Sequence, residues 1–264
     1  MKQYAIGMST CGELICPEDF LKYAKAGVCK MELSFPCHAY SGIDWAALKR
    51  GADSAGVELF SVHLPFSMES NPAQLDESVR QAAVKNFKNI MAKSSVTGAG
   101  VYVIHASSEQ ILDGDRPAAM KNAKKSLAEL AGFARKMGVR IAVEDLPRTC
   151  LGKNSDEILE LISAHENLYV CFDTNHLLGE DISAFVERVG GKIITTHVSD
   201  YDFIDERHWL PGRGSINWPE LMDALDKAGY NGPLMYELKM GRLTPEDFVQ
   251  NAQELMERRP LTKR

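Results

Sequence analysis

Short apolar runs alternate with longer segments of helical period along all 264 residues of the chain. A helix after each strand returns the chain to the end of the sheet at which that strand began, so that successive strands run parallel. Eight such runs occur, and eight is the number of strands that closes a (β/α)8 barrel. The predicted strands are 4–9, 28–35, 57–66, 100–107, 140–147, 168–176, 192–200 and 233–239.

The segments between these runs carry helix start and stop signals. Ser155 and Thr244 are predicted N-caps, and Pro245 takes the first helical position after Thr244. Several segments end in glycine just before the next run, as in AKAGV, DSAGV and ARKMGV. A doubly wound sheet is the alternative, but the first run is not followed by a Gly-rich turn. With no low-complexity linker, we predict one TIM-barrel domain over residues 1–264.

Composition narrows the expected partners. The formal net charge of −6 argues against a broad basic surface for nucleic-acid phosphates. The sequence has no uninterrupted apolar stretch of about 18 residues, and its start lacks the features of a signal peptide. We therefore expect a cytoplasmic protein that binds a small molecule and neither nucleic acid nor membrane, and the sequence is compatible with a homo-oligomer. The six cysteines form no C-x-x-C pair and are expected to be free thiols.

Acidic and imidazole side chains stand at the ends of the third to eighth predicted strands. In a TIM barrel these strand ends surround the mouth of the active site. Several buried carboxylates aimed at one axis would repel each other and lose hydration, and a divalent cation relieves both costs. The residues are His63, His105, Glu144, Asp173, His176, His197, Asp200 and Glu237.

Four of these residues make a candidate metal-ligand set. Glu144, Asp173, His197 and Glu237 come from the fifth to the eighth strand, one residue from each. Three carboxylates and one imidazole suit Mn²⁺, Co²⁺, Zn²⁺ or Mg²⁺ and leave positions for substrate oxygens. We predict one such ion per chain.

Several segments also carry a family resemblance, namely SVHLPF, VIHAS, VEDLPR, CFDTNH, THVSDYDFIDERHWLPGRGSINW and MYELK. The chain resembles the xylose isomerase-like TIM-barrel superfamily over essentially its whole length. This superfamily includes sugar phosphate isomerases and epimerases together with apurinic-site endonucleases of the endonuclease IV type. The most specific matches are the D-x-x-H from Asp173 to His176 and the H-V-S-D that precedes R-H-x-x-P-G-x-G.

The resemblance to ketose 3-epimerases implies roles for individual residues. In those enzymes the positions of Glu144, Asp173, His197 and Glu237 hold one divalent metal, and the two glutamates double as catalytic acid and base. The positions of His176 and Arg207 bind substrate oxygens there.

The endonuclease branch implies further ligands. There the positions of His63 and His105 help to bind a second zinc ion, and the position of His176 together with a D-x-H segment binds a third. Here that segment reads Glu206-Arg207-His208, so Glu206 and His208 are predicted as additional metal or substrate ligands. For an isomerase site we predict that His63 and His105 bind substrate.

Other residues near the strand ends are predicted to support the site. Asp145 and Asp200 adjoin predicted ligands and are expected to orient a ligand or Arg207 from behind. Glu32, His38, Phe66 and Trp209 are candidates for the walls of the pocket.

Together these features predict a metal-dependent isomerase or epimerase of a sugar, sugar phosphate or polyol ketone. It would remove a proton next to a carbonyl and pass through a metal-stabilised enediolate. Two alternatives stay open: an inosose-type dehydratase on the same metal site, and an endonuclease IV-like multi-zinc phosphodiesterase. Acidic loops at 67–78 and 107–115 disfavour binding to duplex DNA. Cys150 stands where ketose 3-epimerases often carry a substrate-binding Glu, so the identity of the sugar stays open.

Overall fold

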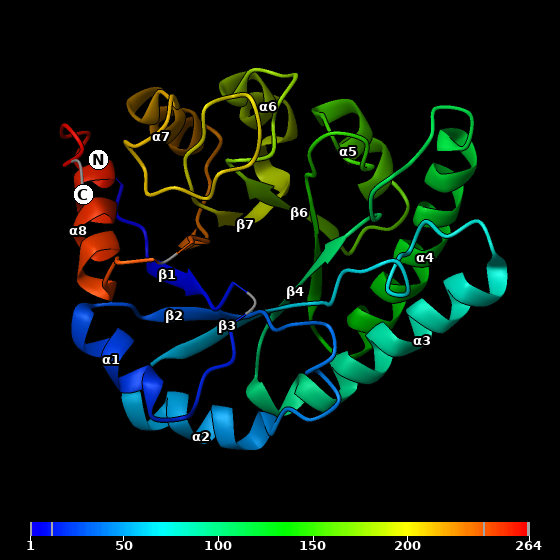
Figure 1. Cartoon of the computed structure of the whole chain (residues 1–264), viewed down its shortest axis with the longest axis horizontal. Coiled ribbons are helices and arrows are strands. Elements are labelled where there is room, and N and C mark those ends of the chain that lie inside the picture. The colour runs from blue at the N-terminus through cyan, green and yellow to red at the C-terminus, as the bar shows by residue number, and fades with distance from the viewer. Residues whose placement is uncertain (1, 12, 240, 263–264) are drawn as a thin grey trace.

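A computed structural model describes residues 2–11, 13–239 and 241–262 of the chain. In these ranges strands and helices alternate, and the helices surround the strands (Figure 1). The strands are β1 (Ile6–Ser9), β2 (Lys30–Leu33), β3 (Glu58–His63), β4 (Val101–His105), β5 (Arg140–Glu144), β6 (Leu168–Asp173), β7 (Ile193–His197) and β8 (Leu234–Tyr236). The α-helices are α1 (Asp19–Ala26), α2 (Trp45–Ala55), α3 (Glu77–Ser94), α4 (Arg116–Lys136), α5 (Ser155–Ile162), α6 (Ile182–Val189), α7 (Trp218–Lys227) and α8 (Pro245–Met256).

The strands form a parallel sheet that nearly closes on itself. Its order is β7-β6-β5-β4-β3-β2-β1-β8, so β1 pairs with both β2 and β8. Just beyond β7, a parallel bridge joins Val198 to Tyr236, and the Val198 N–H donates to the Met235 carbonyl over 2.8 Å. The predicted single-domain (β/α)8 TIM barrel is therefore confirmed.

Side chains along each strand point alternately to the barrel axis and to the helices. A small inner cluster of Val101, Val103, Ala142 and Cys171 is fully buried inside the barrel. The much larger outer cluster, which includes Tyr102, packs between the strands and the helices. The inner cluster itself consists of small and medium-sized side chains, with the partly buried Phe60 and Ile194 packed against it. Bulkier residues of the outer cluster pack against the helices.

The inward-facing residues at the C-terminal ends of the strands belong to the predicted site. His105 stands two residues after Val103 on β4, Glu144 two after Ala142 on β5, and Asp173 two after Cys171 on β6. The residues at the top of the inner rows are therefore polar, whereas those beneath them are apolar.

The helix caps agree with the sequence in one case and differ in another. Thr244 is the N-cap of α8, as predicted, and Pro245 is the first residue of the helix. The predicted Ser155 cap of α5 is wrong by one residue. The N-cap is Asn154, whose side chain accepts the Glu157 N–H over 2.9 Å. The Ser155 hydroxyl instead donates to Glu180 Oε1 over 2.6 Å.

All six cysteines are free thiols. Across the described residues, no helix has both the length and the apolar composition that crossing a membrane requires.

Candidate active site

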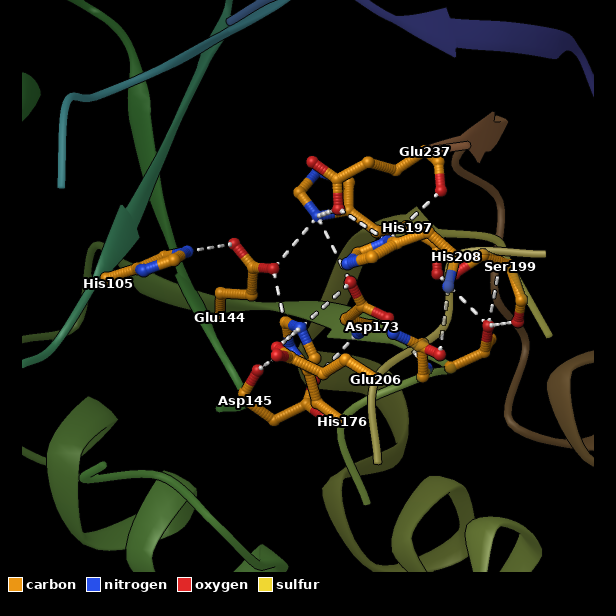
Figure 2. A network of polar contacts seen from close by, with 12 residues as sticks. His105, Glu144, Asp145, Asp173, His176, His197, Ser199, Glu206, His208 and Glu237 are labelled. Atoms are coloured by element: carbon orange, nitrogen blue, oxygen red, sulfur yellow. Dashed lines mark hydrogen bonds and ion pairs between the residues drawn. The ribbon is translucent and has the colours of Figure 1, made fainter. Parts of the chain in front are cut away.

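The four predicted metal ligands meet at the C-terminal end of the barrel (Figure 2). Glu144, Asp173 and His197 are the last residues of β5, β6 and β7, and Glu237 directly follows β8. One ligand atom from each residue can be chosen so that all four lie within 4.8 Å of one another. His197 Nδ1 lies 3.0 Å from Glu144 Oε1, 3.5 Å from Glu237 Oε2 and 3.8 Å from Asp173 Oδ2. The structure thus brings the whole predicted set together.

The electrostatics of this cluster favour a bound cation. Asp173 is fully buried, and its Oδ2 has no hydrogen-bond partner among the described residues. Burial raises the pKa of Asp173 well above its ordinary value, and the neighbouring carboxylates of Glu237 and Glu144 add to this effect. A divalent cation would restore the charged form of Asp173 and satisfy its free oxygen, so the donor set fits a metal ion.

Two histidines contact the other oxygen of Glu144. His63 Nε2 lies 3.0 Å and His105 Nε2 3.1 Å from Glu144 Oε2. Burial alone would raise the pKa of the Glu144 carboxyl, but His197 and His105 outweigh it and hold the pKa well below its ordinary value. The Phe66 ring stacks on His105 with centroids 4.3 Å apart. His63, His105 and Glu144 also form a second group with the spacing of metal ligands.

A third such group combines His176, after β6, with Glu206 and His208 from the loop between β7 and α7. His176 Nε2 lies 2.9 Å from Glu206 Oε1, and Figure 2 shows these residues beside the first cluster. Arg148 Nη1 lies 2.7 Å from the other Glu206 oxygen, Oε2. Arg148 was not predicted as a site residue from the sequence, although it ends the VEDLPR segment that carries the family resemblance.

Buried polar side chains hold the ligands and the loop from behind. Asp145 Oδ1 accepts the Asp173 N–H over 2.8 Å, and the Asp145 carbonyl accepts a hydrogen bond from His176 Nδ1 over 2.7 Å. Burial raises the pKa of the Asp145 carboxyl to about 7. Asn175, which the sequence analysis also missed, accepts the Arg207 N–H over 3.0 Å. The signal available for Asn175 was its place inside the D-x-x-H segment.

Two residues lie elsewhere than the pocket positions expected for them. Arg207 turns outward, where its Nε donates to Asp202 Oδ2 over 2.8 Å and its guanidinium lies 5.8 Å from the Trp209 ring centroid. Arg207 is not among the residues that line the cavity above the cluster, and its role in substrate binding stays a prediction. Glu32 lies within β2 with no exposed surface and contacts His197 from behind.

The cavity above the cluster has a volume of about 330 Å³. The predicted residues Glu144 and Glu237 form part of its polar surface, together with the histidines at 63, 105, 176 and 208. Phe35, Pro36 and Phe66 contribute an apolar wall, so the expectation for Phe66 agrees with its position. Among the described residues, neither lysine nor arginine lines this cavity.

A (β/α)8 barrel with carboxylates and imidazoles gathered at its C-terminal mouth defines a class of TIM-barrel proteins with a candidate metal centre. The model of the xylose isomerase-like TIM-barrel family matches residues 20–259, so the chain belongs to this family. The resemblance inferred from the sequence motifs is thereby confirmed.

Relatives differ in what is known of them. An uncharacterised protein of Methanocaldococcus jannaschii is 29% identical over 187 residues, which cover 67% of this chain and 64% of that protein. The chain is 27% identical to a D-psicose 3-epimerase of Ruminiclostridium cellulolyticum over 83% of this chain and 78% of the epimerase. It is 26% identical to an inosose isomerase of Bacillus velezensis over 69% of this chain and 70% of the isomerase.

A solved structure shows the same fold over nearly the whole chain. The crystal structure of a D-tagatose 3-epimerase-like protein superposes with a TM-score of 0.82 at 25% identity. The superposition covers 96% of this chain and 98% of that protein.

Proposed function

We propose that this chain is a divalent-metal-dependent isomerase or epimerase of a sugar or polyol ketone. The observation that carries the proposal is the convergence of Glu144, Asp173, His197 and Glu237 within 4.8 Å at a cavity of about 330 Å³. The relatives named as epimerases and isomerases support the same class of reaction. We propose one ion per chain, which could be Mn²⁺, Co²⁺, Zn²⁺ or Mg²⁺.

When bound, such an ion supplies a Lewis acid that stabilises negative charge on oxygens next to the reacting carbon. Glu144 and Glu237 supply the proton chemistry, because both carboxylates line the cavity and reach it from different strands (Figure 2). One carboxylate removes the proton from the carbon beside the carbonyl, and the electron pair moves onto the carbonyl oxygen. The second carboxylate delivers a proton to the opposite face of that carbon, which inverts it.

The histidines place the catalytic carboxylate and the substrate. His63 and His105 both contact Glu144 Oε2, so they fix the direction in which the other oxygen, Oε1, points. Together with His176 they line the cavity, and we propose that they contact substrate hydroxyls. At His176 a hydroxyl would replace the Glu206 carboxylate, which contacts Nε2 in this structure. The apolar wall and the absence of lysine and arginine from the described cavity residues favour an unphosphorylated substrate.

A hydrogen-exchange experiment tests this proposal. A panel of ketoses and inosose-like ketones is incubated with metal-loaded protein in D₂O and followed by proton NMR. We expect deuterium to enter at one carbon, because a proton held by a glutamate equilibrates with solvent before it returns. The exchange should stop when a chelator removes the metal. Exchange accompanied by loss of water, with no epimer, would reassign the chain to the dehydratase alternative. Binding without exchange across the panel would refute the roles of both glutamates.

A second candidate function is a multi-metal phosphodiesterase. The observation in its favour is that the groups His63–His105–Glu144 and His176–Glu206–His208 flank the first cluster with ligand spacing. Against it, Arg148 already pairs with Glu206, and the net charge of −6 opposes binding to duplex DNA. Metal analysis of the purified protein separates the two candidates. About one equivalent per chain supports the isomerase, whereas three equivalents with incision of abasic-site DNA would support the phosphodiesterase.

A further inference from the structure

Glu32 is a buried carboxylate that touches the candidate metal centre from outside the cavity. It lies on β2 with 0% exposure, and it does not line the cavity above the cluster. Its Oε1 lies 2.9 Å from His197 Nε2, and its Oε2 accepts a hydrogen bond from Ser61 Oγ over 2.8 Å. Both carboxylate oxygens therefore have a partner, and neither faces the substrate.

His197 lies between two groups of carboxylates. Its Nε2 faces Glu32, whereas its Nδ1 faces Glu144, Asp173 and Glu237 at 3.0, 3.8 and 3.5 Å. A neutral imidazole carries one proton, and a ring nitrogen binds a metal only through a free lone pair. If the proton is on Nδ1, where Glu144 can accept it, Nδ1 has no free lone pair. His197 then cannot bind a metal ion held by Glu144, Asp173 and Glu237.

We propose that Glu32 is a positioning residue that holds the His197 proton on Nε2 and so leaves Nδ1 free to bind the metal. This inference rests on the proposed metal-dependent function. The Glu32 carboxylate accepts the Nε2–H more strongly than a neutral group would, because hydrogen bonds to ionised acceptors are the stronger ones. The hydrogen bond from Ser61 fixes the carboxylate, which in turn fixes the plane of the imidazole ring.

The position of Glu32 in its strand supports a specific role. Its neighbours Met31 and Leu33 are fully buried in the outer core, so alternation turns Glu32 to the inside of the barrel. Burial of a charged carboxylate away from water costs free energy unless the carboxylate is paired. Here its partners are the imidazole of His197 and the hydroxyl of Ser61.

Substitution of Glu32→Gln tests the inference, because the amide keeps the shape but can offer either an oxygen or an NH₂ group to Nε2. We expect the affinity for Mn²⁺ or Zn²⁺, measured by competition with a chelating dye, to fall by about 10- to 100-fold. Saturating metal should restore most of the turnover, since Glu32 does not touch substrate. Glu254→Gln is the matched control. Glu254 is also buried, at 3% exposure, but it lies on α8 and should leave metal affinity unchanged.

A second measurement determines which ring nitrogen of His197 carries the proton. In zinc-loaded wild-type protein, long-range ¹H–¹⁵N spectra should place the His197 proton on Nε2, and a proton on Nδ1 would overturn the inference. If Glu32→Gln folds poorly, Ser61→Ala provides the test, with a smaller loss of metal affinity expected. A wild-type chain that binds no divalent ion would remove the proposed function together with this inference. Unchanged metal affinity in folded Glu32→Gln would overturn the inference alone.

Discussion

The strand ends and the loop between β7 and α7 both contribute to the candidate site, but their geometry is fixed in different ways. At the strand ends, the sheet itself sets the spacing, because His105 pairs in register with Glu144, and Asp173 with His197. In residues 201–217 between β7 and α7, individual side chains hold the backbone. The geometry of the proposed metal-ligand set therefore comes from the hydrogen-bonded sheet, whereas the geometry of the loop depends on a few side-chain hydrogen bonds.

Asp200 is the main support of that loop. Its Oδ2 accepts the Gly212 N–H over 2.7 Å and the Trp218 Nε1–H over 3.0 Å, and its backbone pairs with Trp209. A side chain at position 214 would meet the Tyr201 carbonyl 2.2 Å from its Cβ, so only glycine fits at that point. Loosening these contacts should affect the loop while sparing the strand ends.

The largest effect is expected at the strand ends. Glu237→Gln removes a proposed acid-base group and a proposed ligand, so turnover should fall by about 10³-fold. Most bound metal should also be lost, while circular dichroism shows a folded barrel, because Glu237 is partly exposed and its substitution relieves repulsion among the clustered carboxylates. Metal analysis and the D₂O exchange rate measure both effects. A variant that keeps full turnover would contradict the mechanism, and Glu254→Gln controls for the loss of a buried charge.

A smaller and different effect is expected when the loop support is removed. Asp200→Ala leaves the N–H groups of Gly212 and Trp218 without their acceptor, which should cost about 1–3 kcal/mol of unfolding free energy. Denaturant unfolding measures this cost. The variant should still bind one equivalent of metal, because the four proposed ligands stand at strand ends. The loop reaches this set through the contacts of His208 with Glu237. Loss of metal in a folded Asp200→Ala protein would show that the two regions are not independent.

The same division explains what the sequence could predict. The period-two pattern of VYVIH on β4 and RIAVE on β5 already puts His105 and Glu144 on the inside of the barrel, at the end of each strand. The fold and the family were therefore predicted correctly, and the four proposed ligands were found to converge. The sequence pointed to Glu32 as a wall of the pocket, and its place between the apolar residues Met31 and Leu33 could have turned it to the inside of the barrel instead.

Loop residues gave no such signal. Arg148 and His208 both adopt positive φ angles, of 55° and 51°, which no local pattern of the sequence indicates. The contact of Arg148 with Glu206 joins residues from two different loops, so it depends on how the finished barrel brings those loops together. For the same reason the sequence could not predict that Arg207 turns towards Asp202.

Arg207 lies in the loop between β7 and α7 and tests whether that loop contributes to substrate binding. If the loop swings Arg207 from Asp202 onto a substrate oxygen, Arg207→Ala should raise KM by about 10-fold, the equivalent of one charged hydrogen bond. Metal affinity should not change, because Arg207 is not one of the four proposed ligands and its side chain pairs with Asp202. Asp202→Ala is the matched control, since it removes the ion pair but keeps the guanidinium. An unchanged KM in Arg207→Ala would mean that Arg207 only pairs with Asp202 at the surface.

The smallest effect is expected in a second loop, between β5 and α5, which an ion pair outside the barrel supports. Arg116 donates to the Thr149 carbonyl over 2.9 Å and to Glu157 Oε2 over 2.6 Å. Glu157 Oε2 also accepts the Gly152 N–H over 2.9 Å. Burial would raise the pKa of Glu157, but Arg116 and the Gly152 N–H outweigh it and hold the pKa below its ordinary value of 4.5.

Glu157→Gln should therefore lower the unfolding free energy by about 1 kcal/mol at neutral pH, with little change in turnover. Because the pKa of Glu157 is lower in the folded chain than in the unfolded chain, its stabilisation is complete above the unfolded value of 4.5. That stabilisation disappears as the pH falls through the folded value, so the unfolding curves of wild type and variant should converge in acid. Glu160→Gln controls for a change of charge on the same helix, since Glu160 pairs with Lys124 at an exposed position. A difference between wild type and Glu157→Gln that persists undiminished in acid would mean that the NH₂ group of the amide, facing the Gly152 N–H or Arg116, disrupts the β5–α5 loop independently of the lost charge.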